Sequence, residues 1–336
     1  MTRLILTTSD SGAGCLGQTG IADIVIPFDF RFVWGPLPSV SDLATLFATR
    51  SEQHGPTVPH WLDNFDNGHR EKIRQKGFGL LDLCGQCETV DLWVDPEPNA
   101  QLMLICLLDF FHSHGRSPSP MTLFQADVVI GNQSPETLSK WKPVAVQVDN
   151  DCFEAASTAW DAYRQPTPQA WFDLLGKDLG VLPQLRQSVL ELLEELPAPA
   201  TGLGATEMHL LELISVGDAT PFDLFPGHDR RNKRRVFGYW EVGSLLDGLA
   251  NCSSPAISGL DGSPFTLELH DDRSRLKRYE QSSLSLTALG RKILAQTEDF
   301  SRHNPINRWW GGTELRNDCL WRWDAVGRSL IVPQAA

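Results

Sequence analysis

The sequence predicts an α/β protein in which a Rossmann-like, mostly parallel sheet precedes a helical segment and a winged-helix-like C-terminal domain. An apolar strand, a loop of small residues and a helix follow one another at Arg3–Gly20, and a strand, a turn and a helix return at 89–111. Beyond residue 151 apolar residues recur at helical spacing, and later three helical segments precede a candidate hairpin. These observations divide the chain into a sheet domain at 1–150, a helical segment at 151–200 and a winged-helix-like domain at 201–336.

The composition is that of an ordinary globular protein. The 336 residues suffice for two cores, with 41% hydrophobic and 21% charged residues. No signal peptide and no run of about 18 apolar residues is present, so we expect a cytoplasmic protein with no membrane partner. Seven scattered cysteines favour reduced thiols. The close pair Cys84 and Cys87 lacks a second pair for zinc, so no metal site is predicted.

The opening unit is the predicted functional site. Leu4–Leu6 indicates a buried strand, and the loop Ser9–Gly14 leads into a helix. Such a junction directs backbone N–H groups and the positive end of a helix dipole at one point, which suits an anion or an oxygen-rich ligand. We expect Asp10 and Ser11 to be catalytic, and Ser9, Gly12 and Gly14 to bind the ligand. The loop matches neither a P-loop nor a full dinucleotide fingerprint, so the cofactor stays unknown and an ordinary turn is the alternative.

Ser11 can also be interpreted as a nucleophile. A strand that ends in Asp-Ser resembles the first block of GDS-type esterases, which also need a late His with an Asp three residues before it. The chain has this spacing only at Asp109 and His112, early and inside an apolar helix-like run. A GDS-type esterase is therefore an alternative to the main prediction.

The other elements of the first domain follow from apolar runs and turn residues. Strands are expected at Ile24–Phe28, Phe30–Val33, Thr89–Val94, Met121–Ile130 and Val144–Val148, and helices at Val40–Thr49, His69–Leu83 and Gln101–Phe111. Because the carboxyl ends of parallel strands meet at one edge of a sheet, Asp95 and Gln101 are expected to face the Ser9–Gly14 loop, unless they merely cap the helix.

The second half is predicted to be mainly helical. An apolar stripe at 185–196 is closed by a Pro/Gly-containing linker at 198–204, where the domain boundary is expected. Three helices are expected beyond it, at 206–216, from Thr220 and at 232–249. Strands at 265–269 and 283–286 would form the wing.

A dense basic cluster falls at the expected start of the third of these helices. It consists of Arg230, Arg231, Lys233, Arg234 and Arg235. Helix-turn-helix proteins meet bases and phosphates at this position, so a ligand-responsive DNA-binding regulator is the second functional class. However, residues 1–200 hold 13 basic and 25 acidic residues and would repel a duplex. The favoured partner is therefore a small phosphate-bearing or amino-acid-like molecule, bound by an enzyme of transfer or hydrolysis type or by a pure binding protein.

Several motifs along the chain resemble those of a bacterial two-domain family. They are the Gly35–Pro38 turn, Leu92-Trp93 followed by Gln101-Leu102, the segments 160–166 and 287–290, and the RWxGG…WRWD ending at 308–324. In that family a domain of unknown function, of the GDS-loop α/β type, precedes a winged-helix-like partner domain. This chain departs from it at Pro305, Asn307 and Tyr239, where relatives carry Gly, Asp and Asp. The resemblance implies the fold and no particular reaction.

The C-terminal stretch 303–324 is expected to be docked, because it holds four tryptophans beside arginines that stack on such rings. We expect it to reach the first domain and to bring Arg308, Trp309 or Asp324 near the Ser9–Gly14 loop, where Arg308 would offer a positive fork to an anion. The alternative is that these residues hold the two domains together without touching a ligand.

Overall fold

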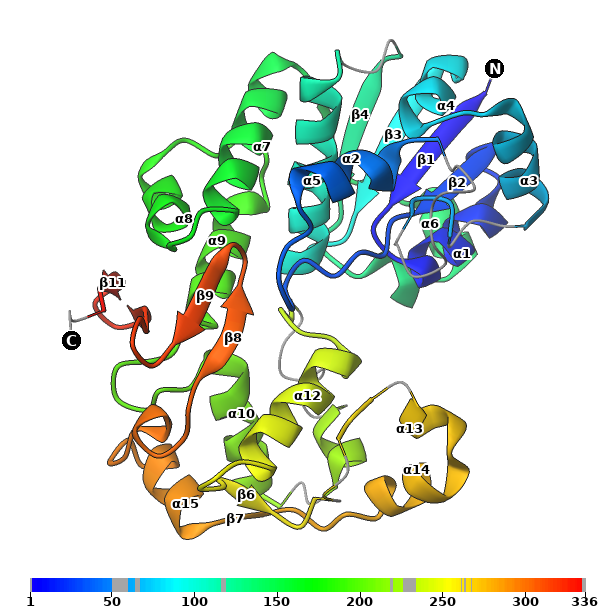
Figure 1. Cartoon of the computed structure of the whole chain (residues 1–336). Coiled ribbons are helices and arrows are strands. Elements are labelled where there is room, and N and C mark those ends of the chain that lie inside the picture. Colours follow the sequence, from blue (N-terminus) through cyan, green and yellow to red (C-terminus); the bar gives the residue numbers. More distant parts are fainter. Residues whose placement is uncertain are drawn as a thin grey trace. The chain divides into compact units, whose positions relative to one another are not determined.

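The computed structural model describes residues 2–49, 60–63, 67–115, 119–217, 220–225, 234–260, 262, 264–266 and 268–333. The chain divides into two units (Figure 1): the first comprises Met1–Gln165 and Asp173–Ser188, and the second Pro166–Phe172 and Val189–Ala336. The predicted linker at 198–204 lies inside the second unit. Within the described ranges, no helix combines the length and the apolar character that a membrane crossing requires.

The first unit is built on a five-stranded sheet of order β2-β1-β3-β4-β5. The central strand β1 (Arg3–Thr7) pairs in parallel with β2 (Ile24–Pro27) and with β3 (Thr89–Val94). β3 pairs in parallel with β4 (Met121–Gln125), whereas β5 (Ala145–Gln147) runs antiparallel to β4. The prediction of an α/β protein with a mostly parallel sheet is therefore confirmed.

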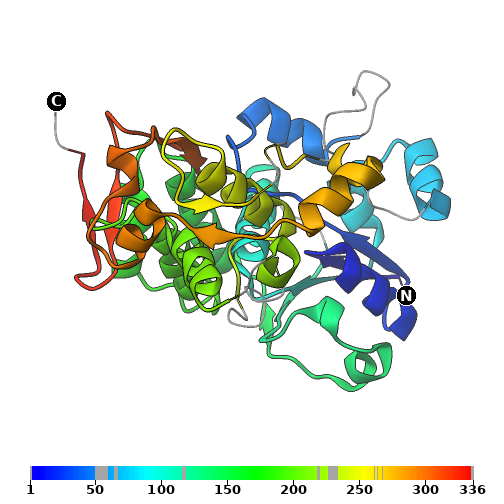
Figure 2. The same cartoon turned by 90° about the horizontal axis from the view of Figure 1, so that it is seen from below.

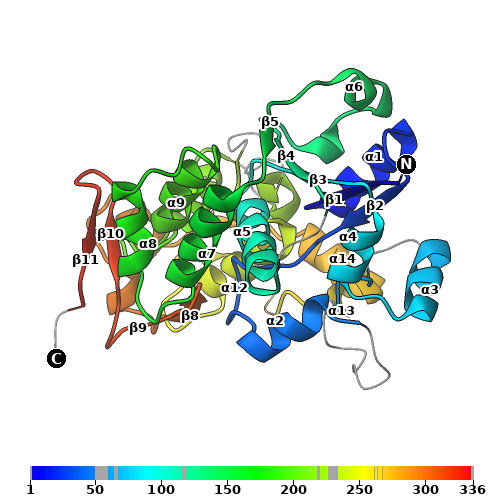
Figure 3. The same cartoon turned by 90° about the horizontal axis from the view of Figure 1, so that it is seen from above.

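Helices cover both faces of this sheet. Figure 3 shows α1 (Asp10–Thr19) and α6 (Pro135–Lys140) on one side and α5 (Pro98–Ser113) on the other, where α7 (Asn150–Tyr163) packs along it. Because side chains alternate along a strand, Ile5 and Trp93 pack with Leu16 of α1, while Leu6 and Leu92 face the α5 side. α5 is apolar almost all round because it is covered on both of its sides.

Short helices complete the first unit, and one predicted helix is divided. The elements are α2 (Val40–Phe47), α3 (Asn67–Lys76), α4 (Leu80–Gln86), η1 (Ile130–Asn132) and η2 (Leu174–Gly176). The single helix expected at His69–Leu83 is wrong, because Gly77 adopts φ 65° between α3 and α4. A right-handed helix cannot continue through that backbone conformation.

The strand predicted at Phe30–Val33 is also wrong. The backbone there bonds to a side chain instead of a neighbouring strand: Asn99 Nδ2 donates to Phe30 O at 2.8 Å, and Phe32 N–H donates to Asn99 Oδ1 at 2.9 Å. Tyr163 Oη of α7 donates to Phe32 O at 3.2 Å. The aromatic residues of this segment therefore cover the α5 side of the sheet without joining it.

The second unit is mainly helical, with short two-stranded pairs. Its helices include α8 (Gln169–Asp173), the end of α9 (Leu185–Glu194), α10 (Ala205–Ser215), α12 (Tyr239–Ala250), α13 (Glu268–Asp271), α14 (Arg273–Glu280), α15 (Ala288–Leu294) and η3 (Phe300–Arg302). Its strands are β6 (Ile257–Ser258), β7 (Ser285–Leu286), β8 (Asn307–Trp310), β9 (Thr313–Arg316), β10 (Arg322–Asp324) and β11 (Ser329–Ile331). α10 packs against α12, α15 and β7.

Two details of the predicted wing and its helix are wrong. The helix expected at 232–249 begins at Tyr239, because the Glu241 side chain accepts a hydrogen bond from Gly238 N–H at 2.8 Å and caps the helix there. The strand at 283–286 pairs with Ile257–Ser258 and not with 265–269. Phe265 instead packs among the rings of Tyr239, Trp240 and Tyr279. The helices α13 and α14 therefore lie between the paired strands β6 and β7 along the chain.

The C-terminal hairpins dock on the helical segment of their own unit (Figures 1 and 2). Trp310 is buried, its ring meets Trp171 edge-on, and its Nε1 donates to Leu192 O at 2.7 Å. Trp323 packs beside Phe172. The expectation that this aromatic stretch is docked agrees with these contacts.

Candidate functional site

The candidate site lies at the edge of the sheet where β1, β3 and β4 end. Ser9 follows β1 and caps α1: its backbone is extended, and its Oγ accepts a hydrogen bond from Gly12 N–H at 3.2 Å. Asp95 follows β3, and the segment 126–132 follows β4. The parallel order of these strands brings the three segments together, as the repeated strand–turn–helix pattern predicts.

Asp95 forms hydrogen bonds with the other two segments. Its side chain is buried, with 2% of its surface exposed. Oδ2 accepts from Ser9 Oγ at 3.0 Å, and Oδ1 accepts from Ile130 N–H at 2.7 Å. The Asp95 N–H donates to Thr8 Oγ1 at 3.1 Å. Burial raises the pKa of Asp95, while the hydrogen bonds from Ile130, Ser9 and Thr8 oppose that rise.

A chain of buried amides supports Asp95 in turn. Gln101 Nε2 donates to Asp95 O at 2.8 Å, and Gln125 Nε2 donates to Gln101 Oε1 at 2.8 Å. Gln125 Oε1 accepts from the backbone N–H of Gln184 at 2.9 Å. The structure therefore brings Gln101 to the predicted edge, but as a buried support beneath the loop, since it is 1% exposed.

The segment predicted as the Ser9–Gly14 loop is not a loop in the structure: Ser9 is the N-cap of α1, and Asp10–Gly14 are its first five residues. Asp10 and Ser11 occupy the first two positions of this helix and are exposed. Partial desolvation raises the pKa of the Asp10 carboxyl, and the negative charge of Asp29 raises it further. Asp29 follows β2 and is exposed as well. The charge of Asp29 therefore acts on Asp10, which directly follows the Ser9 cap that is bonded to Asp95. Asp29 was not predicted from the sequence, because a single acidic residue between two phenylalanines forms no recognisable motif.

Glycines allow the segments to approach closely. A Cβ on Gly131 would lie 2.1 Å from Ser11 Oγ, and one on Gly12 would lie 2.8 Å from Ser9 Oγ. A Cβ on Gly14, in contrast, would meet no described atom within 4 Å. Gly12 is thus required for packing of α1, whereas Gly14 borders open space.

The Asp109 and His112 pair of the esterase alternative lies far from Ser11. Both residues sit in the last part of α5, which starts next to Asp95 and runs 16 residues away from it. At about 1.5 Å per residue, the far end of α5 is about 20 Å from the Ser9–Gly14 loop. This pair therefore cannot serve Ser11 as its base in this conformation.

Cys84 and Cys87 are both buried in the first unit, near the end of α4. Burial raises the pKa of both thiols, which disfavours the reactive thiolate. Ser119 Oγ donates to Cys84 O at 3.0 Å and to Cys87 O at 2.5 Å. Within the ranges that the structure describes, no cluster of three or more metal-ligating side chains occurs.

The predicted tail residues have their own contacts in the second unit. Arg308 Nη1 donates to Glu207 Oε2 at 2.8 Å, and Nη2 donates to Glu195 O at 3.3 Å. Asp324 Oδ1 accepts from the N–H groups of Val326 and Gly327, both at 3.0 Å, and shapes the turn between β10 and β11. Trp309 is 38% exposed. A meeting of these residues with the Ser9–Gly14 loop stays a prediction.

Most of the basic cluster lies outside the described residues, namely Arg230, Arg231 and Lys233. Arg234 is described, and its Nε donates to Glu191 Oε1 at 2.9 Å and to Oε2 at 3.2 Å. Arg235 precedes α12 by several residues. The charge of Arg234 is therefore already balanced by a carboxylate.

Comparison with known proteins adds no assignment to this geometry. No protein-family model matches the chain. No curated protein shows significant similarity to it either. The resemblance to the bacterial two-domain family therefore stays a prediction, and the function has to be argued from the site.

Proposed function

We propose that the Ser9–Gly14 loop of the first unit binds a small amino-acid-like molecule and acts on it in a transfer or hydrolysis reaction. The proposal depends on one observation: buried Asp95 holds both Ser9, the N-cap of α1, and the backbone of Ile130, so the exposed carboxyl of Asp10 stands at a fixed helix start. The negative charge of Asp29 acts on this carboxyl as well. Two neighbouring negative groups disfavour a phosphate and favour an ammonium group. The start of α1 beside them suits the carboxylate of the same ligand.

Asp10 is the proposed acid–base group. Its raised pKa brings it closer to the pH at which a carboxyl can both accept and donate a proton. Ser9 and Asp95 are positioning residues, because they bond to each other and to the surrounding backbone. Ser11 lies next to Asp10 on α1 and is the proposed second polar contact of the ligand.

Asp10→Asn is expected to weaken ligand binding by about tenfold or more, because a hydrogen bond to a charged group is worth about 1.5–3 kcal/mol. The standard amino acids serve as probes, with chemical-shift changes of labelled protein as the readout. Native mass spectrometry of the wild-type protein shows in addition whether a small molecule co-purifies. Thermal unfolding should stay nearly unchanged, since Asp10 is exposed.

Asp151→Asn is the matched control. Asp151 is an exposed acid in the first turn of α7, in the same unit but away from the Ser9–Gly14 loop. It should bind the probes like the wild type. If Asp10→Asn and Asp151→Asn bind equally well, Asp10 does not belong to the site.

A second candidate function is DNA binding by a winged-helix-like second unit. It is supported by the packing of α10 with α12 and α15 beside the β6–β7 pair, and by the exposed basic residues Arg273, Lys277 and Arg278 of α14. The ion pair of Arg234 with Glu191 and the acidic first unit count against it.

Weak, strongly salt-dependent binding to duplex DNA is the expected result. Each phosphate contact contributes about 0.9 log units of affinity per log unit of salt, so few contacts should remain occupied near ~150 mM salt. Fluorescence anisotropy of a labelled duplex at increasing salt measures this. Nanomolar binding at ~150 mM salt would reverse the order of the two proposed functions.

A further inference from the structure

The second unit contains a pocket that was not predicted from the sequence. It has a volume of about 510 Å³ and is lined by residues of η3, β10 and β11 and by their flanking loops. That volume lies within the range of ligand-binding pockets. All of its lining residues belong to the second unit, so this pocket is separate from the Ser9–Gly14 loop.

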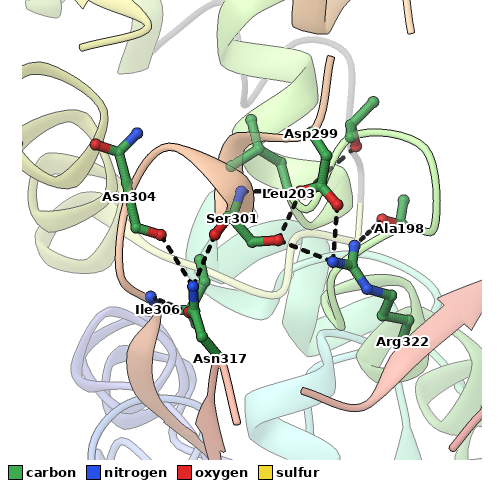
Figure 4. Close-up of polar contacts among 9 residues, drawn as sticks. Ala198, Leu203, Asp299, Ser301, Asn304, Ile306, Asn317 and Arg322 are labelled. Atoms are coloured by element: carbon green, nitrogen blue, oxygen red, sulfur yellow. Dashed lines mark hydrogen bonds and ion pairs between the residues drawn. The ribbon is translucent and has the colours of Figure 1, made fainter. Parts of the chain in front are cut away.

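A fixed polar network forms one wall of the pocket (Figure 4). Arg322 Nη2 donates to Asp299 Oδ2 and to Ser301 Oγ, both at 2.8 Å, and its Nη1 donates to Ala198 O at 2.9 Å. Asp299 Oδ1 accepts from Ser301 N–H at 2.8 Å and from Ser301 Oγ at 2.6 Å. Asp299 and Ser301 are both 7% exposed. The wall is therefore rigid before any ligand arrives.

One of the charged residues that line the pocket forms no ion pair with a described residue. Arg322 neutralises Asp299, and Asp318 is held by Arg316 through two contacts of 3.2 Å each. Arg302 also lines the pocket, is exposed, and forms no ion pair with any described residue. The lining therefore holds two arginines and two aspartates, and Arg302 is the arginine among them that pairs with no described carboxylate.

Another part of the lining is apolar. Leu320, Ile331, Val332 and Pro333 form it, with Pro199 at its border. Ile331 and Val332 are 38% and 59% exposed, so part of this apolar lining is in contact with water. An apolar group in the pocket would remove part of this surface from water.

We infer that this pocket binds a small organic carboxylate with a branched aliphatic body. Arg302 contacts the carboxylate, Arg322 and Ser301 supply the fixed polar wall beside it, and the aliphatic part packs on Leu320, Ile331 and Val332. A guanidinium fork matches a carboxylate in geometry as well as in charge. The inference is independent of the function proposed for the first unit, because no residue is shared between the two sites.

Isovalerate and its neutral analogue isovaleramide test this inference on the full chain. Both have the same branched body, and only isovalerate has the charge that Arg302 would contact. Binding is followed by titration calorimetry and by the tryptophan fluorescence of the wild type. Arg302→Gln should weaken isovalerate binding about tenfold and leave isovaleramide binding unchanged.

Two further variants test whether the loss of isovalerate binding is specific to this pocket. Arg291→Gln removes an exposed arginine of α15 that does not line the pocket and should bind isovalerate like the wild type. Val332→Trp should fill the pocket and weaken both probes. Absence of isovalerate binding to the wild type, equal binding of the two probes, or no effect of Arg302→Gln would each overturn the inference. Inorganic phosphate that competes fully with isovalerate would refute the role of the aliphatic wall.

Discussion

Replacement of Arg308 by methionine is expected to lower the free energy of unfolding of the second unit by about 3 kcal/mol or more. Arg308 bonds to Glu207 at 2.8 Å and to the backbone of Glu195, and the side chain of Glu207 is only 9% exposed. Without the guanidinium, a nearly buried carboxylate loses its partner. Denaturant unfolding followed by tryptophan fluorescence measures the change.

Arg316→Met is the matched control for this experiment. Arg316 lies on the partner strand of the same hairpin, and its ion pairs with Glu314 and Asp318 are solvent-exposed. Exposed pairs contribute at most about 1 kcal/mol, so this variant should stay close to the wild type. If Arg308→Met and Arg316→Met lower the free energy of unfolding equally, the contact of Arg308 with Glu207 contributes no more than an exposed ion pair.

Arg308→Lys separates the two predicted roles of Arg308. If Arg308 contacts a ligand at the Ser9–Gly14 loop, the affinity for amino-acid probes should fall by much more than the stability does. If it only holds the hairpin to its own unit, stability and affinity should fall together. The contacts with Glu207 and Glu195 favour the second result.

The stability of the second unit is expected to fall by about 3 kcal/mol between pH 4.5 and about 7. Burial raises the pKa of Glu195 from 4.5 to about 7, opposed by hydrogen bonds from Thr206 and by Arg308, while Glu207 adds to the rise. In this window the folded protein holds a proton that the unfolded chain has released. Unfolding therefore becomes easier as the pH increases, and the contribution is constant above the folded pKa.

Glu195→Gln should flatten this pH dependence, because the amide has no proton to exchange in the window. The free energy of unfolding is measured at several pH values for the wild type and the variant. Glu314→Gln, an exchange at an exposed position of β9, should keep the slope of the wild type. If the free energy of unfolding of Glu195→Gln still falls between pH 4.5 and about 7, another titratable group causes the pH dependence.

The sequence was most informative where the structure is determined locally. The opening strand and the position of Asp95 could be predicted, because strand, turn and helix follow one another along the chain. The helix was expected only after Gly14, whereas Ser9 caps it and α1 already begins at Asp10. Phe30–Val33 was not predictable, since its backbone partner is Asn99, which lies far along the chain. The predicted strand pairing of the wing was wrong for the same reason. Ser285–Leu286 pairs with Ile257–Ser258, which lies far away along the chain, and no short turn joins the two strands. Asp29 and Arg302 were missed because each is a single charged residue that only the fold places beside others.

The chain of buried amides that supports Asp95 couples the candidate site to α9. It ends at the backbone of Gln184, directly before α9, and α9 is the helix by which the chain leaves the first unit for the second. A rotation of the first turn of α9 therefore has to stretch or break the Gln184–Gln125 hydrogen bond. The strain would pass through Gln101 to the backbone oxygen of Asp95. This crossing between the units is thus coupled to the floor of the candidate site by four residues that three direct hydrogen bonds join.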